Sequence, residues 1–120
     1  MFTNKSMFYD PIDDGTAEIL RINIDGSYSS VVVNVFYTIG GVSPSELAFR
    51  ERAEGVILEP VTIGERTYGM WIPQGKKLYN EKASKLLGKE VRGNVYIIRT
   101  DSYREFLEPE DIEYIKNTVG

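Results

Sequence analysis

The stretch LYNEKASKLLGKEVRGNVYIIRT, residues 78–100, predicts a short helix, a glycine stop and then a strand. Asn80 is a favourable N-cap, because its side-chain oxygen can accept a hydrogen bond from a free backbone N–H of the first turn. Leu86 and Leu87 give the helix an apolar face, and Gly88 stands where a left-handed residue commonly ends a helix. The β-branched residues that follow predict the strand.

Seven of the 14 Lys and Arg residues lie in or just before this stretch, although the whole chain has a net charge of −4. These cations, which we call the basic island, are Lys76, Lys77, Lys82, Lys85, Lys89, Arg92 and Arg99. Only Glu81 and Glu90 oppose them, so the local balance is +5. The region after the island is acidic, and we expect the two regions to attract each other within one chain or between chains.

The basic island is a candidate binding site for an anion. Lys82, Lys85 and Lys89 are three and four residues apart, so a helix would carry them on one face. Arg99 lies on the same predicted strand face as apolar residues, so we expect it to point inward and to need a partner or ligand. Arg92 and Arg99 could each grip a phosphate through two parallel hydrogen bonds.

Two aromatic residues near the island could stack a nucleotide base. Trp71 and Tyr79 are close in sequence to the lysines, although Trp71 is also compatible with an ordinary core position. The predicted ligand-binding residues are Trp71, Lys76, Lys77, Tyr79, Lys82, Lys85, Arg92 and Arg99.

Residues 17–38 predict a first β-hairpin. Apolar and polar residues alternate before Asp25-Gly26, a pair that favours a two-residue turn because both residues tolerate positive φ. The second strand, residues 31–38, is apolar on nearly both faces, which predicts a central position in a sheet.

A second hairpin is predicted for residues 56–73, around the turn Gly64-Glu65-Arg66. Pro60 lies within its first strand. Because proline has no N–H to donate, this strand should lie at a sheet edge or contain a bulge.

Two more helices are predicted from their first turns. Ser43 is a favourable N-cap, followed by Pro44 and by Glu46 at the capping-box position. The preceding Gly40-Gly41 could belong to a phosphate loop, but Pro44 lacks a donor and Glu46 would repel an anion, so a structural turn is favoured. The last helix begins near Pro109, and its apolar stripe consists of Ile112, Ile115 and Val119.

The predicted order is hairpin, helix, hairpin, helix, strand, helix. This order favours one α+β domain over residues 1–120, with residues 1–16 as an irregular N-terminal segment. We expect an antiparallel or mixed sheet built from two hairpins and a further strand, with two or three short helices packed on one side. The carboxylates of the first segment, Asp10, Asp13 and Asp14, do not have the spacing of a calcium loop.

The composition excludes several chemistries. The chain has no cysteine and no histidine, which removes disulfides, thiolate metal sites and the commonest general base. The negative net charge argues against a nucleic-acid polymer as partner. The N-terminus lacks the apolar run of a signal peptide, and no apolar run is long enough to span a membrane, so a cytoplasmic protein is expected. No cofactor is expected.

The C-terminal third resembles a family of uncharacterised small proteins from phages, plasmids and conjugative elements. The matching residues are Asn80, Ala83, Leu87, Gly88, Gly93, Phe106, Leu107, Glu110, Asp111 and Ile112. Glu108 departs from the family pattern, which prefers Ser or Thr at that position. The resemblance implies an origin in a mobile element but no particular activity.

Three functional hypotheses follow. The first is a non-enzymatic protein that binds, and so sequesters, a small phosphorylated or nucleotide-like ligand, in counter-defence. The second is an inhibitor that contacts a host enzyme through the acidic surface near the C-terminus. The third is an enzyme that uses carboxylates alone, which the absence of histidine and cysteine disfavours. A homo-oligomer is also expected, because basic and acidic surfaces on one chain can pair between copies.

Overall fold

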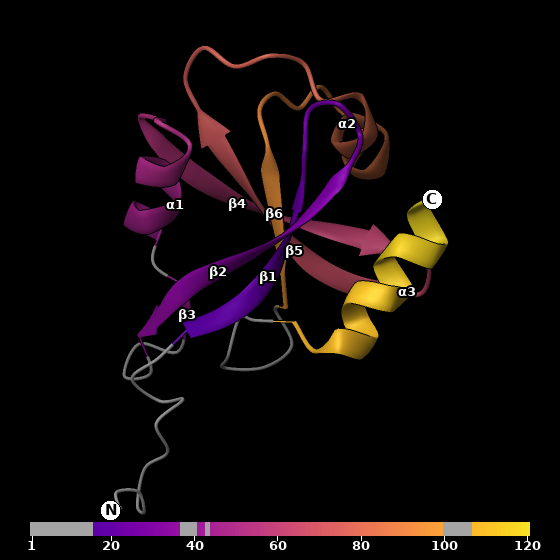
Figure 1. Ribbon diagram of the computed structural model, residues 1–120. Coiled ribbons are helices and arrows are strands. Elements are labelled where there is room, and N and C mark those ends of the chain that lie inside the picture. The colour runs from indigo at the N-terminus through magenta and orange to yellow at the C-terminus, as the bar shows by residue number, and fades with distance from the viewer. Residues whose placement is uncertain (1–15, 37–40, 43, 100–106) are drawn as a thin grey trace, which may run out of the picture.

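The computed structural model describes residues 16–36, 41–42, 44–99 and 107–120 (Figure 1). They form a six-stranded sheet in the order β3-β2-β1-β6-β5-β4, with every neighbouring pair antiparallel. The strands are β1 (Thr16–Ile22), β2 (Tyr28–Phe36), β3 (Gly41–Val42), β4 (Gly55–Ile63), β5 (Arg66–Gln74) and β6 (Val95–Ile98). The helices are α1 (Pro44–Arg50), α2 (Glu81–Leu87) and α3 (Pro109–Val119). The predicted α+β class is confirmed.

Helices cover both faces of the sheet (Figure 1). All four residues of β6 are buried, and they alternate between two apolar clusters. Val95 and Ile97 belong to the larger cluster, which includes Ile115 and other residues of α2 and α3. Tyr96 belongs to the smaller cluster with Leu47 of α1. Two helices therefore share one face, as predicted, and α1 packs on the other.

The first hairpin differs from its prediction at the turn. The last strand pair is Ile22 with Tyr28, and the Asn23 N–H donates to the Ser27 carbonyl at 2.8 Å. Three residues, with Gly26 at φ +90°, therefore lie between Asn23 and Ser27, and the predicted two-residue turn is wrong. The side chain of Asn23 stabilises the longer turn by donating to the Ser27 hydroxyl at 3.0 Å.

The predicted central position of residues 31–38 is wrong for the part that the structure describes. Among the described residues, the outer side of β2 pairs at Val35 and Phe36, with the two-residue strand β3. The central pair of the sheet is β1 and β6 instead. Val32 is more than half exposed as a result.

The second hairpin is confirmed, but its turn consists of Gly64 and Glu65 alone, because Arg66, predicted in the turn, pairs with Ile63 as the first residue of β5. Its first strand, β4, lies at the sheet edge, as Pro60 predicts. Gly64 has φ +65°, and an added Cβ would overlap the hydroxyl of Tyr114 on α3. That hydroxyl accepts a hydrogen bond from the Glu65 N–H at 2.9 Å, so the tight turn docks α3 against the sheet.

The predicted caps of α2 are confirmed. The side-chain oxygen of Asn80 accepts a hydrogen bond from the Ala83 N–H at 3.0 Å, and Gly88 is left-handed at φ +80°. Asn80 is fully buried, and its amide also donates to the carbonyls of Ile22 at 3.1 Å and Gly93 at 2.8 Å. This one side chain therefore joins α2 to β1 and to the loop before β6.

The other two helices begin with the predicted prolines, Pro44 and Pro109. Ile115 is fully buried, with the rest of the α3 stripe packed around it, as predicted. Some sequence predictions lie outside the described residues: those for Asp10, Asp13, Asp14, Gly40, Ser43 and Phe106.

Candidate functional site

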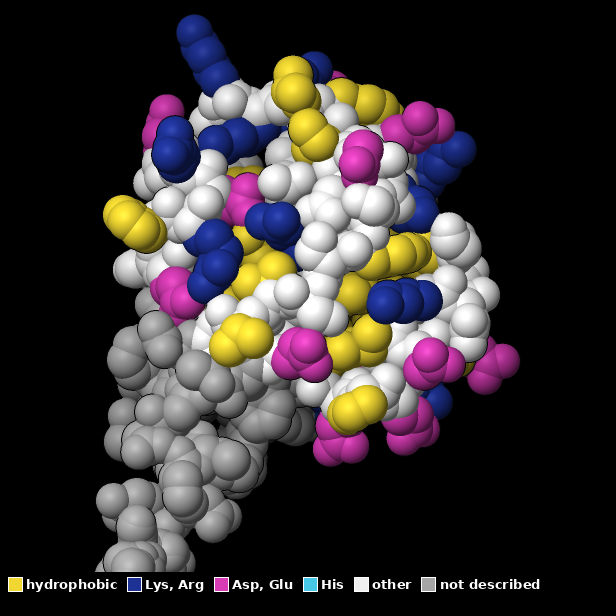
Figure 2. All heavy atoms as spheres, viewed as in Figure 1, with side chains coloured by type: hydrophobic (Ala, Val, Ile, Leu, Met, Phe, Trp, Pro, Cys, Tyr) yellow, Lys and Arg dark blue, Asp and Glu magenta, His cyan; other side chains and the backbone are white. Residues whose placement is uncertain are grey.

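The basic island is spread over the molecule. Its seven cations line four surface cavities among the described residues, two of which adjoin and share Gly75 and Arg92. On the face drawn in Figure 2, Lys and Arg side chains are scattered and stand beside Asp and Glu at several places. The eight predicted site residues therefore do not converge on one cavity.

The three lysines predicted to share a helix face are divided. Lys82 and Lys85 line one cavity on α2. Lys89 lies in another and forms an ion pair with Glu59 of β4 at 2.9 Å. The prediction is wrong for Lys89, because the left-handed Gly88 ends α2 and turns the chain away from the helix face.

Arg99 has two partners in the acidic region. Its Nη1 lies 3.8 Å from a carboxylate oxygen of Glu108 and 3.9 Å from one of Asp111, both at the start of α3. Arg66 approaches Asp111 from β5 at 3.4 Å. The predicted attraction between basic and acidic regions thus occurs within the chain at Arg99, and it neutralises part of the acidic surface.

Three cations of the island do come together. Lys76, Lys77 and Arg92 line a cavity of about 430 Å³ with Gly75 and Leu78, which we call the basic cavity. It lies where the loop after β5 meets the loop before β6. Its lining contains no Asp or Glu, whereas each of the other three cavities includes at least two carboxylates. Among these four, the basic cavity has the strongest positive character.

Hydrogen bonds orient two of these cations. The Lys77 Nζ donates to the carbonyls of Glu51 at 2.6 Å and Arg52 at 3.0 Å, at the C-terminal end of α1, where backbone carbonyls lack helical partners. The guanidinium of Arg92 donates to the Lys77 carbonyl at 3.2 Å and to the Glu90 carboxylate. Lys77 therefore also has a structural role, while Arg92 spans the two loops.

Backbone contacts hold the two loops together. The Gly93 N–H donates to the Leu78 carbonyl at 2.7 Å, and Tyr79 pairs with Arg92 in an isolated antiparallel bridge. Gly93 has φ +89°, and a Cβ there would lie 2.8 Å from Pro73 Cγ. Only glycine suits this close approach, so packing accounts for the glycine without a ligand.

The two predicted stacking residues are in different environments. Trp71 packs against the apolar cluster under α1, which agrees with the alternative interpretation of this residue as part of the core. Tyr79 is 50% exposed beside the basic cavity, next to Leu78, which is 69% exposed. Neither aromatic side chain lines any of the four cavities. Of the two, Tyr79 has the exposure that a stacking residue needs.

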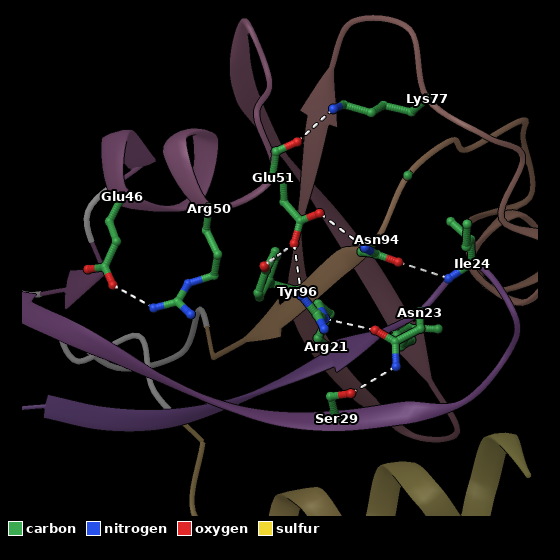
Figure 3. A network of polar contacts seen from close by, with 12 residues as sticks. Arg21, Asn23, Ile24, Ser29, Glu46, Arg50, Glu51, Lys77, Asn94 and Tyr96 are labelled. Carbon is green, nitrogen blue, oxygen red and sulfur yellow. Dashed lines mark hydrogen bonds and ion pairs between the residues drawn. The ribbon is translucent and has the colours of Figure 1, made fainter.

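A polar network on the α1 face was not anticipated from the sequence (Figure 3). Its centre is Glu51, whose side chain is only 7% exposed. The carboxylate accepts hydrogen bonds from the Tyr96 hydroxyl, from Arg21 Nη1 at 3.2 Å and from Asn94 Nδ2 at 3.1 Å. Arg21 also donates to Asn23 at 2.7 Å, so the network crosses β1 and β6 and anchors the end of α1.

The environment of Tyr96 favours its neutral form. Burial raises the pKa of the Tyr96 phenol above its usual value of 10.0, and the hydrogen bond to Glu51 raises it further. The donors around Glu51 come from residues 30 to 45 positions away in sequence. No local pattern signals such a cluster, because Arg21 and Asn23 alternate with apolar residues as solvent-facing residues normally do.

No group of three or more metal-ligating side chains is found among the residues that the structure describes. Within those same ranges, no helix has the length and apolar character needed to cross a membrane.

Comparisons with protein-family models, curated proteins and solved structures found no match to this chain. The predicted homo-oligomer stays a prediction, because the structure contains a single chain.

Proposed function

We propose that this protein is a non-enzymatic binding protein for a small anionic ligand, phosphorylated or nucleotide-like, at the basic cavity. One observation carries the proposal: Lys76, Lys77 and Arg92 line one cavity whose lining contains no carboxylate. A phosphate group there would be attracted by several cations at once.

The three cations would have different roles. Lys76 is exposed and supplies a mobile positive charge. The two hydrogen bonds of Arg92 to Lys77 and Glu90 use two of the five N–H donors of its guanidinium, so it can also donate to a phosphate oxygen. Lys77 is held by the carbonyls of Glu51 and Arg52, which follow α1, and contributes its charge from a fixed position.

Tyr79 would allow the site to prefer a nucleotide over a simple anion, because its ring can contact the base. Paired residues in an antiparallel bridge project to the same side, so the bridge between Tyr79 and Arg92 directs both side chains to one side of the loops. The exposed ring of Tyr79 could then stack on a base while Arg92 holds a phosphate.

The resemblance to proteins of phages and other mobile elements suggests a setting for this binding. A small protein that sequesters a signalling nucleotide of the host would act in counter-defence. We propose no catalytic role for the polar network, because the carboxylate of Glu51 already accepts hydrogen bonds from three protein donors.

Calorimetric titration tests the proposal. ADP, cyclic dinucleotides and pyrophosphate would be titrated into wild type, into the double variant Lys76→Gln/Arg92→Gln and into Tyr79→Ala. We expect the double variant to bind at least ~10-fold more weakly to every ligand that wild type binds, a loss of about 1.4 kcal/mol. Tyr79→Ala should weaken nucleotides but not pyrophosphate. Lys116→Gln, which removes one positive charge from an exposed position of α3, is the control for a charge lost outside the cavity.

Two outcomes would overturn the proposal. Wild type could bind none of these ligands at millimolar concentration, or the double variant could bind as tightly as the Lys116→Gln control. In either case the alternative hypothesis, an inhibitor that contacts a host enzyme through its acidic surface, would be tested next. Its first test is charge reversal of Glu110 and Glu113 on α3.

A further inference from the structure

A second cavity has a lining of a different kind. At about 460 Å³ it is the largest of the four, and it lies between the turn of the first hairpin, α2 and the end of α3. Its lining includes two carboxylates, Asp25 and Glu81, and two ammonium groups, Lys82 and Lys85. The formal charges cancel, so this cavity does not share the preference of the basic cavity for a simple anion.

Apolar side chains complete the lining. Ile24 comes from the hairpin turn, Leu86 from α2 and Val119 from α3. Ile24 is one of the exposed large apolar residues of the chain, at 37% exposure. Covering such surface with an apolar group is favourable by about 25 cal/mol per Å². The cavity thus offers both signs of charge around an apolar surface.

One charged side chain of each sign, Asp25 and Lys82, is held in place by hydrogen bonds. The carboxylate of Asp25 accepts hydrogen bonds from the Ser27 N–H at 2.9 Å and from the Ser27 hydroxyl at 2.6 Å, both at Oδ1. These bonds lower the pKa of Asp25, so the carboxylate is ionised at neutral pH. The Lys82 Nζ donates to the Gly120 carbonyl at 2.9 Å and lies 4.7 Å from the centre of the Tyr28 ring.

The other two ions form only a weak pair with each other. Lys85 and Glu81 are 3.2 Å apart, but their side chains are 77% and 69% exposed. Exposed pairs of this kind contribute about 0.5 kcal/mol or less. A ligand can therefore exchange this pair for contacts of its own at little cost.

We infer that this cavity binds a small zwitterion with an apolar side chain, of the class of free α-amino acids such as leucine or phenylalanine. The carboxylate of the ligand pairs with Lys82 and Lys85, and its ammonium group pairs with Asp25 and Glu81. The apolar side chain covers Ile24 and its apolar neighbours. The cavity volume falls within the range of small-molecule sites. This inference rests on residues outside the basic cavity and is independent of the function proposed there.

NMR titration of the full chain with four probes tests the inference. The probes are L-leucine, L-phenylalanine, N-acetyl-L-leucine, which lacks the ammonium group, and L-leucinamide, which lacks the carboxylate. We expect saturable shifts of the Gly26 amide signal with both amino acids, with Kd on the order of 1 mM or tighter. Each truncated probe should bind at least ~10-fold more weakly, because each leaves one pair of charges unmatched.

Variants separate the two charge contacts. Asp25→Asn keeps a side-chain oxygen for the turn and should weaken leucine at least ~5-fold without weakening N-acetyl-L-leucine, whose anion the lost carboxylate would repel. Lys85→Gln should weaken leucine and N-acetyl-L-leucine alike but should not weaken leucinamide. Lys89→Gln, an equal charge change just after α2 but outside this cavity, is the control and should change none of these affinities. The inference is overturned if no probe gives saturable shifts by ~10 mM, if N-acetyl-L-leucine binds as tightly as leucine, or if both cavity variants bind leucine like wild type.

Discussion

On one face of the sheet α2 and α3 pack through a large, continuous apolar cluster, whereas on the other face α1 rests on a smaller cluster and on the polar network of Glu51. Apolar burial is roughly proportional to area and has no preferred direction. Hydrogen bonds around a buried carboxylate depend on distance and angle. The difference shows two ways to fix a short helix: by area on one face, and by a few directional contacts on the other.

Asn80 is a buried polar residue on the apolar face, so its substitution shows whether α2 is held by apolar area alone. Asn80→Ala removes its three hydrogen bonds and leaves buried backbone groups of Ile22, Ala83 and Gly93 without that partner. We expect the free energy of unfolding to fall by about 3 kcal/mol, measured by urea denaturation. Asn117→Ala, at an exposed position of α3, should change it by less than about 0.5 kcal/mol. A small effect at Asn80 would mean that area alone holds α2.

Substitution of Glu51 measures how much the polar network contributes to stability on the α1 face. Glu51→Gln keeps the size of the side chain but removes its charge beside Arg21, and its new amide would face hydrogen-bond donors. We expect a loss of about 2 kcal/mol, less than for a fully buried pair because Arg21 is partly exposed. Glu54→Gln, at a nearby exposed residue, is the control for the charge change. Equal stability of the two variants would show that the small apolar cluster suffices to hold α1.

Gly64 tests how α3 is fixed to the apolar face. Gly64→Ala places a Cβ against the hydroxyl of Tyr114 and forces alanine into a left-handed conformation. A loss of about 1.5 kcal/mol is expected in thermal or urea unfolding. Gly55→Ala is a matched control on β4, because a Cβ there meets nothing within 4 Å and its φ lies outside the left-handed region. If both variants are equally stable, the contact between this turn and α3 does not constrain the helix.

Tyr96 makes the stability of the folded protein depend on pH. Burial keeps its phenol neutral, so the pKa in the folded protein lies above the unfolded value of about 10. Its contribution to stability is complete below about pH 10 and is lost as the pH rises further, because only the unfolded chain then releases the proton readily. Tyr96→Phe should cost about 1 kcal/mol at neutral pH, through the lost hydrogen bond to Glu51. Above pH 10 its stability should fall less steeply than that of wild type. Parallel pH profiles would contradict this assignment.

Local signals predicted much of the fold. Asn80 and Gly88 mark both ends of α2, and Pro60 assigns β4 to an edge, because each effect depends on residues adjacent in sequence. The candidate site was harder to predict. The position of Lys89 depends on one left-handed residue, and the partner of Arg99 on where α3 docks. The Glu51 network joins elements far apart in the chain, so no short pattern contains it.

The position of β6 has a consequence for how the chain is made. This strand lies between the two hairpins and pairs Ile97 with Leu20 on one side and with Met70 on the other. Both hairpins are therefore complete long before the strand that joins them has been synthesised. During translation each has an unpaired inner edge, and such edges promote association between chains. The nascent chain therefore most needs a chaperone in the interval after the second hairpin has been synthesised and before β6, whose pairing closes both edges, has emerged.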